Sequence, residues 1–320
     1  MTVTDQVLIL PKLGFGAGAF SGRYNEIDEK AAAEAVKESF DLGINYYDTS
    51  PYYNSSETIL GNALHALRDE MPRERYVLST KVGRYGATPA DCDYSRDRVM
   101  ASVTESLRRL HTDYLDVVLC HDVEFVSLAE VTDQALPALY DLKSQGIVRQ
   151  VGISGYPLPT LLRIAEIQHD CGTPLDVVFS YCHFNLHNRQ FQDYAPRFRA
   201  FGVKYLINAS PLSMGLLRAS RDPPDWHPAN DALRAAAREA VALCRKRGLD
   251  IAELATRFSL DGNADGMFDT TVLGISNAHE IRQAVEWLNA GPVTDPVATE
   301  TLQDLLEIFR PFEAYTWPSP

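Results

Sequence analysis

The chain has few cysteines, and their spacing excludes the frameworks that proteins build on thiols. Only five occur in 320 residues, and none belongs to a C-x-x-C pair: Cys92, Cys120, Cys171, Cys182 and Cys244. An odd, scattered set predicts neither a disulfide network nor a zinc site. Reduced thiols are typical of the cytosol, so we predict a cytoplasmic protein.

Positive charge is scarce as well. The sequence has 30 Lys and Arg against 43 Asp and Glu, a formal net charge of −13. Nucleic acids and anionic membranes require clustered cations, so this balance argues against both partners. It leaves room for one anionic cofactor in a local pocket.

Long apolar runs are also missing. No segment approaches the ~18 apolar residues of a membrane helix. The first residues, MTVTDQVLIL, lack the basic region of a signal peptide. The sequence therefore predicts neither a membrane span nor a secretory signal.

Short apolar runs instead alternate with amphipathic helical patterns, as at Val99, Val103, Leu107 and Leu110. We predict one α/β domain over residues 1–320, a (β/α)8 TIM barrel. An open doubly wound sheet is the alternative; the count of eight strands and the lack of a break between halves favour the barrel. The predicted strands are Leu13–Gly16, Asn45–Asp48, Val77–Lys81, Leu115–Cys120, Val148–Ile153, Val177–Ser180, Lys204–Ile207 and Thr271–Gly274.

Three segments lie outside this repeat. Residues 1–12 are predicted to form an N-terminal hairpin that closes the bottom of the barrel. Ser210–Ala229 is a long, proline-rich stretch that we interpret as a loop over the site. Near the end, a C-terminal helix is predicted from the apolar face Leu302, Leu305, Leu306 and Phe309. Helix ends are predicted at Gly43, Gly146 and Gly202, because glycine tolerates the left-handed conformation.

Three polar side chains end predicted strands: Asp48, Lys81 and His121. Active sites of βα barrels form at the carboxyl ends of the strands, so these groups should meet, with Tyr53 on the loop after Asp48. A free phenol has a pKa near ~10, and a nearby ammonium lowers it. We predict that Lys81, held by Asp48, activates Tyr53 for proton transfer while His121 hydrogen-bonds a substrate oxygen. Tyr52 is the adjacent alternative, and spacing alone does not decide.

Two other kinds of site are disfavoured. His121-Asp122 and His183 lack the H-x-x-H or H-E-x-x-H spacing of metal ligands, so no metal is predicted. The run Gly14-x-Gly16-x-Gly18 lacks the third glycine of a Rossmann fingerprint, and we interpret it as a strand-and-turn feature.

The four residues Asp48, Tyr53, Lys81 and His121, in this order, resemble the catalytic tetrad of the aldo-keto reductase superfamily. Its first motif, an Asp followed five positions later by a Tyr, selects Tyr53 over Tyr52. The resemblance implies a (β/α)8 barrel that binds a nicotinamide cofactor without a Rossmann fold. From about Gly14 to Pro318 the chain looks most like the L-galactose and D-arabinose dehydrogenases of plants and fungi. That implies NAD-dependent oxidation of an aldose of the L-galactose, D-arabinose or L-fucose type at C1, with a lactone product that feeds ascorbate-type biosynthesis.

Cofactor residues carry over from this resemblance unevenly. Ser154 matches a serine that binds the nicotinamide amide, whereas Gly155 replaces the usual Asn, Ser180 the usual Gln and Ala209 the usual stacking aromatic. The remaining cofactor-binding residues implied by the resemblance are Ser210 and Leu212 on the pyrophosphate side, and Gly274 and Ser276 in the adenosine loop.

Cofactor choice is predicted from Glu280, which stands where NADP-dependent relatives keep an Arg. A 2′-phosphate requires Arg or Lys, and none occurs from Gly274 to Ile281. We therefore predict NAD; Arg282 would bind the phosphate if the register slipped.

Aromatic and polar residues are predicted to line the sugar pocket: Tyr52, Tyr85, Phe125, Trp226 and His227. Trp226 and Trp317 have an alternative role in fixing a loop against the barrel. Two other functions stay open, an NADPH-dependent carbonyl reductase and a non-catalytic nucleotide-binding regulatory subunit. The preferred aldose and the oligomeric state are not predicted.

Overall fold

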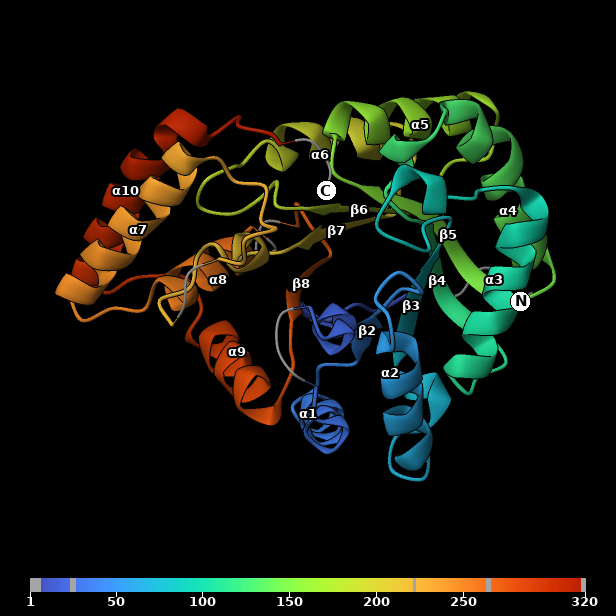
Figure 1. Ribbon diagram of the computed structural model, residues 1–320, viewed down its shortest axis with the longest axis horizontal. Helices are drawn as coiled ribbons and strands as arrows, with labels where there is room; N and C mark the ends of the chain where they lie inside the picture. Colours follow the sequence, from blue (N-terminus) through green and yellow to red (C-terminus); the bar gives the residue numbers. More distant parts are fainter. Residues whose placement is uncertain (1–6, 24–26, 221–222, 263–265, 318–320) are drawn as a thin grey trace.

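Eight parallel strands form the centre of the molecule. The computed structural model describes residues 7–23, 27–220, 223–262 and 266–317. Each strand pairs with the next along the chain and the last pairs with the first, so the sheet closes into a barrel (Figure 1). The predicted (β/α)8 barrel is confirmed, and the open doubly wound sheet is excluded. The strands are β1 (Leu13–Gly16), β2 (Tyr46–Asp48), β3 (Val77–Val82), β4 (Leu115–Cys120), β5 (Val148–Gly155), β6 (Val177–Tyr181), β7 (Tyr205–Ala209) and β8 (Thr270–Gly274).

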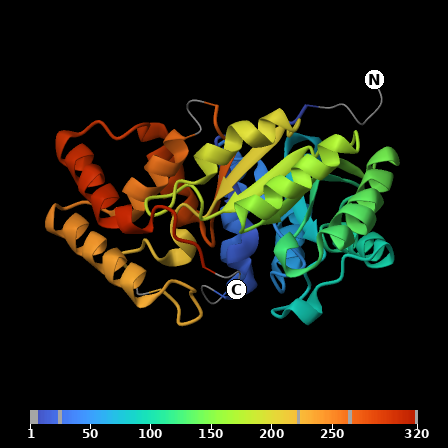
Figure 2. The same ribbon diagram turned by 90° about the horizontal axis from the view of Figure 1, so that it is seen from above.

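Helices cover the outside of this barrel (Figure 1). Two are additional to the repeat: α7 precedes α8 between β7 and β8, and α10 follows α9. These two helices pack against each other at one end of the molecule (Figure 2). The helices are α1 (Glu29–Asp41), α2 (Ser56–Ala66), α3 (Arg96–Arg109), α4 (Leu136–Ser144), α5 (Leu158–Asp170), α6 (Phe191–Ala200), α7 (Asp231–Lys246), α8 (Ile251–Asp261), α9 (Ala278–Ala290) and α10 (Pro296–Phe309).

The apolar core has two layers, because successive side chains of a strand point to opposite faces of the sheet. In β4, Val117 and Leu119 point into the barrel, where they join side chains of the other strands. Val118 and Cys120 belong instead to the layer between the barrel and the helices. All of these residues are fully buried. A strand buried on both faces needs a continuous apolar run, and β4 supplies one from Val117 to Cys120.

The bottom of the barrel is closed differently from the prediction. Residues 7–12 contain no strand, so they form no hairpin; residues 1–6 lie outside the described residues. Leu8 instead packs into the inner layer as part of an irregular segment. Its backbone N–H donates a 2.8 Å hydrogen bond to the hydroxyl of Tyr205, the first residue of β7. One buried leucine and one backbone hydrogen bond therefore replace the paired strands that we expected.

The predicted helix ends and the predicted C-terminal helix are confirmed. Gly43, Gly146 and Gly202 follow α1, α4 and α6 with φ values of 83°, 77° and 82°. In α10, Leu305 and Phe309 are buried. The remaining apolar residues of its predicted face, Leu302 and Leu306, are partly buried against the same core.

Replacing Gly43 by alanine should destabilise the fold without creating a clash. A Cβ at this position meets nothing within 4 Å, so only the left-handed backbone conformation (φ +83°) is strained. We expect Gly43→Ala to lower the free energy of unfolding by about 1–2 kcal/mol in urea denaturation. Gly274→Ala is the control, since its φ is ordinary and the space around it is also open. Equal stability of the two variants would contradict the prediction.

Candidate active site

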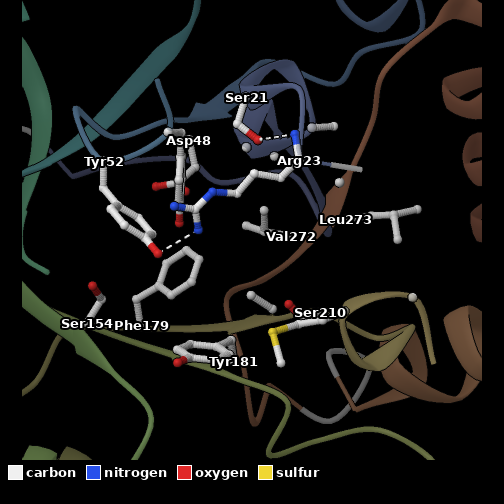
Figure 3. Close-up of a pocket in the computed structure, with 18 of the residues that line it drawn as sticks. Ser21, Arg23, Asp48, Tyr52, Ser154, Phe179, Tyr181, Ser210, Val272 and Leu273 are labelled. Atoms are coloured by element: carbon white, nitrogen blue, oxygen red, sulfur yellow. Dashed lines mark hydrogen bonds between the residues drawn. The ribbon is translucent and has the colours of Figure 1, made fainter. Parts of the chain in front are cut away.

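One pocket at the carboxyl ends of the strands collects all four residues of the predicted catalytic group (Figure 3). Asp48 is the last residue of β2, Lys81 is next to last in β3, and His121 follows directly after β4. Tyr53 lies on the turn between β2 and α2. In the register of the sheet, Asp48 pairs with Ser79, which brings the carboxylate beside the lysine of the neighbouring strand.

Asp48 and Lys81 form a buried ion pair at the base of the pocket. The Nζ atom of Lys81 donates to Asp48 Oδ2 at 2.5 Å and to the carbonyl of Thr49 at 2.9 Å. The Ser79 hydroxyl donates to the other carboxylate oxygen at 2.9 Å. Burial raises the pKa of the Asp48 carboxyl, while the adjacent Lys81 ammonium opposes the shift. A buried ion pair is tolerated where such further hydrogen bonds satisfy its remaining atoms.

Tyr53, and not Tyr52, lies over this lysine. The Lys81 Nζ atom is 5.0 Å from the centroid of the Tyr53 ring. On its other side the ring faces Gly18, where a Cβ would stand only 3.4 Å from it. The glycine run thus begins in β1 and ends at Gly18, in the short helical turn Ala17–Ser21, where it allows close packing against this tyrosine. This agrees with its interpretation as a strand-and-turn feature.

His121 is a neutral imidazole at physiological pH. Burial, aided by the cations of Lys81 and Arg84, lowers its pKa well below the usual value. Its Nδ1 atom lies 3.0 Å from the Ser50 hydroxyl. The ring meets Tyr53 edge to face, with centroids 5.5 Å apart. The imidazole is thus held in place by its neighbours, and it forms hydrogen bonds as an uncharged ring.

A second ion pair, which sequence reasoning missed, lies beside the histidine. Arg84 and Asp122 are both buried, with Nη1 2.5 Å from Oδ2. Arg84 also donates to the Tyr52 hydroxyl at 3.0 Å, and Arg23 donates to the same oxygen at 2.5 Å. Figure 3 shows Arg23 reaching across the pocket to Tyr52. The signal in the sequence was Asp122 itself, directly after a predicted strand; Arg23 had none.

Most of the predicted cofactor residues line the same pocket, at the mouth of the barrel: Ser154, Ser210, Leu212, Gly274 and Glu280. Ser180 lies elsewhere, since its hydroxyl is buried and 3.0 Å from His183 Nδ1. Tyr181, the next residue, lines the pocket in its place and pairs with Ala209 of β7. This ring, which sequence reasoning also missed, stands beside the position where the usual aromatic is absent.

The Glu280 side chain, in the first turn of α9, bonds back to a residue just before the helix. Its Oε2 atom accepts hydrogen bonds from the Ser276 backbone N–H at 2.7 Å and from the Ser276 hydroxyl at 2.9 Å. Asn277 caps the helix by accepting from the Glu280 N–H at 3.1 Å. A carboxylate therefore already occupies a helix N-terminus, which is the kind of position that binds anions. Ser276 does not line the pocket itself but bonds to Glu280, which does.

Of the five residues predicted for the sugar pocket, Tyr52 and Trp226 line it. The Tyr85 hydroxyl turns back to accept from the Gly83 N–H at 3.1 Å, away from the pocket wall. Phe125 packs under Arg84, 4.6 Å from ring centroid to guanidinium carbon. Phe125 therefore supports a residue of the pocket, Arg84, whereas the Tyr85 ring lies against Arg98.

His227, the last of the five, fixes the long loop. Its Nε2–H donates to the Ser213 carbonyl at 2.8 Å, and its Nδ1 accepts from the Ala229 N–H at 3.1 Å. Trp317 of the C-terminal tail packs against the same imidazole, with ring centroids 5.7 Å apart. The two tryptophans thus differ: Trp226 is half exposed at the pocket, and Trp317 is buried and anchors the tail.

Two absences concern the described part of the chain. No cluster of three or more His, Cys, Asp or Glu has the arrangement of a metal site there. Within the same residues, no helix combines the length and the apolar character that crossing a membrane requires.

The family model of the Aldo/keto reductase family matches residues 12–301. A parallel barrel with Asp, Tyr, Lys and His converging at its mouth agrees with that match, and the chain belongs to the aldo-keto reductase family.

Proteins of known name that are similar over most of their length include two dehydrogenases. L-galactose dehydrogenase from Arabidopsis thaliana is 38% identical over 96% of this chain and 93% of its own. D-arabinose 1-dehydrogenase from Saccharomyces cerevisiae is 40% identical over 86% and 82%. Among solved structures, an aldo-keto reductase from Bacillus halodurans in its holo form superposes with a TM-score of 0.69 and 25% identity, covering 94% of both chains.

The buried histidines should make stability fall in mild acid. Burial lowers the pKa of His187 to about 3, with smaller effects from His183 and His227. Between pH 6.5 and 3 the unfolded chain binds a proton there that the folded chain does not, so unfolding is favoured as the pH falls. Each such histidine contributes a slope of up to about 1.4 kcal/mol per pH unit.

His187→Gln should therefore reduce the pH dependence of the unfolding free energy between pH 6.5 and 4, as measured by urea denaturation. Replacement of the exposed residue His169 by Gln is the control and should leave that dependence unchanged. An unchanged slope in His187→Gln would contradict the assignment of a neutral buried imidazole.

Proposed function

We propose that this aldo-keto reductase is an NAD-dependent aldose dehydrogenase that oxidises the anomeric carbon, C1, to a lactone. The observation that carries the proposal is the Lys81 ammonium, 5.0 Å from the Tyr53 ring and paired with a buried carboxylate. Two named relatives at 38% and 40% identity are dehydrogenases of L-galactose and D-arabinose, which supports an aldose as the substrate class.

Tyr53 moves the proton. The C1 hydroxyl of the cyclic sugar gives its proton to the Tyr53 oxygen while C1 gives up a hydride. The Lys81 ammonium stabilises the phenolate form of Tyr53, and Asp48 holds that ammonium in place. A nicotinamide cofactor, when bound, supplies the hydride acceptor.

His121 orients the sugar. The Ser50 oxygen already accepts a hydrogen bond from the Tyr52 N–H at 3.1 Å, so we assign its own hydrogen to His121 Nδ1. That leaves the ring proton on Nε2, which lies 3.5 Å from Asp122 Oδ2 and is donated to the C1 oxygen when a sugar is bound. Because the imidazole is neutral, it hydrogen-bonds the substrate without competing with Tyr53 for the proton.

The pocket residues fit a nicotinamide dinucleotide. Ser154 offers a hydroxyl for the amide group, and Tyr181 offers a ring beside the small side chain of Ala209, against which a nicotinamide can stack. Ser210 and Leu212 lie where the loop after β7 begins, as the resemblance implied for the pyrophosphate side. The missing aromatic at Ala209 is therefore compensated from the adjacent strand.

Glu280 favours NAD over NADP for two reasons. Its carboxylate repels a 2′-phosphate, and it occupies the Ser276 donors that such a phosphate would use. The hydroxyl groups of an unphosphorylated ribose can instead donate hydrogen bonds to it.

Tyr52 and Trp226 provide aromatic surfaces for the sugar. The Tyr52 hydroxyl is held by two guanidiniums, so its ring has a defined orientation when a substrate arrives. Aldoses of the L-galactose, D-arabinose and L-fucose type are the proposed substrates.

Tyr53→Phe should reduce kcat for aldose oxidation by about 10²–10⁴-fold, because it removes the proton acceptor. Formation of NADH, followed by absorbance with L-galactose or D-arabinose as substrate, measures the effect. Tyr194→Phe, on the outer helix α6, is the matched control and should retain full activity. Near-normal turnover by Tyr53→Phe would remove this residue from its proposed role.

Glu280→Gln should change cofactor preference while keeping the local hydrogen bonds, since the amide oxygen still accepts from Ser276. We expect kcat/KM for NADP to rise about tenfold relative to NAD. This corresponds to about 1.4 kcal/mol for the lost repulsion between the carboxylate and the 2′-phosphate. Glu286→Gln, exposed on the same helix, controls for a general change in charge. An unaltered NADP/NAD ratio in Glu280→Gln would refute the role of this carboxylate.

A further inference from the structure

A second hollow lies outside the active site, between α7 and the loop that follows β7. It has a volume of about 380 Å³. Its floor is apolar and is formed by Leu216, Ala237 and Val241. Four arginines line it, which distinguishes it from the rest of a chain with a net charge of −13: Arg218, Arg234, Arg238 and Arg245. We call it the arginine groove.

Three of these arginines share one face of α7. Positions 234, 238 and 245 are separated by one and then by two helical turns, so their side chains stand in a row. Ala237 and Val241 lie between them and keep the space beside the row open. Arg218 approaches from the opposite wall, on the loop after β7. The groove therefore presents guanidiniums from two sides.

None of the four arginines is neutralised by a carboxylate within the described ranges. Arg234 donates to three backbone carbonyls, among them His227 O at 2.6 Å. Among the described residues, Arg245 donates a hydrogen bond of 3.5 Å to the Ala219 carbonyl. By contrast Arg247, at the end of the same helix, forms ion pairs with Glu300 and Asp304. Carbonyl groups orient a guanidinium without cancelling its charge, so the groove keeps a local positive potential.

We propose that the arginine groove binds a small phosphate-bearing molecule. A guanidinium group donates two parallel hydrogen bonds to the oxygens of a phosphate. Several arginines around one hollow can therefore bind a dianion. The volume is within the range of pockets that hold small organic ligands, roughly 300–1,000 Å³. The apolar floor fits a carbon skeleton attached to the phosphate.

The groove is connected to the active site through one side chain. Arg218 lines both hollows, and the loop that carries it also carries Met214 and Trp226 of the catalytic pocket. A ligand in the groove that accepts hydrogen bonds from Arg218 leaves fewer N–H donors of this guanidinium for the catalytic pocket. The two hollows therefore share one guanidinium.

Isothermal titration of the full chain with phenyl phosphate, at constant ionic strength, tests the proposal. The double variant Arg238→Gln/Arg245→Gln removes two exposed guanidiniums, of which Arg245 makes one long hydrogen bond, 3.5 Å to the Ala219 carbonyl. Lys246→Gln is the matched control, because Lys246 is exposed on the same helix but outside the groove. It removes one positive charge, as each of the two arginine substitutions does. Inorganic phosphate is titrated in parallel to separate the two sources of the anion.

We expect saturable binding that weakens at least about tenfold in the double variant and is unchanged in Lys246→Gln. Tighter binding of phenyl phosphate than of inorganic phosphate assigns the groove to an organic phosphate, and equal binding assigns it to the free ion. The proposal is overturned if neither probe binds saturably, or if the double variant binds as the wild type does. Because heat and not turnover is measured, the result is independent of the proposed dehydrogenase activity.

Discussion

The buried ion pair between Asp48 and Lys81 is the constraint on which the active site depends. Two charges without access to bulk water are tolerated only because they neutralise each other and because Ser79 and Thr49 satisfy their remaining atoms. Loss of either partner would leave an uncompensated charge at the mouth of the barrel. The pair also fixes the ammonium beneath Tyr53, so one interaction serves both the stability of the strand ends and the chemistry proposed there.

A second buried pair, Arg84 with Asp122, extends this arrangement to the substrate side. It orients Tyr52 through the phenol oxygen and adds to the positive field that keeps His121 neutral. Four cationic and three acidic side chains line the pocket, so this strongly acidic protein has no excess of negative charge there. An anionic cofactor is attracted by that local field, whatever the sign of the whole molecule.

The loop after β7 forms the opposite wall and is held by distant parts of the chain. His227 bonds to the backbone of the loop, and Trp317 packs on it from the C-terminal tail. Through Arg218 the same loop joins the pocket to the arginine groove. The proposed cofactor pocket and the proposed anion site therefore share one segment, whose conformation is set by tertiary contacts.

The sequence by itself determined the barrel, through the repeated βα period, and determined which of its polar residues end strands and converge. Asp48, Lys81 and His121 were identifiable because the carboxyl ends of parallel strands all lie at the same face of a barrel. A residue that ends a strand in the sequence is therefore also at that face in the structure. Only the tertiary structure decided which neighbour faces the pocket: Tyr181 lines it and Ser180 does not, since adjacent strand residues point to opposite sides and an error of one position exchanges them. Arg23, which reaches the pocket from a loop without periodicity, and the arginine groove, whose walls are separate in the chain, depend on long-range packing that no local pattern encodes.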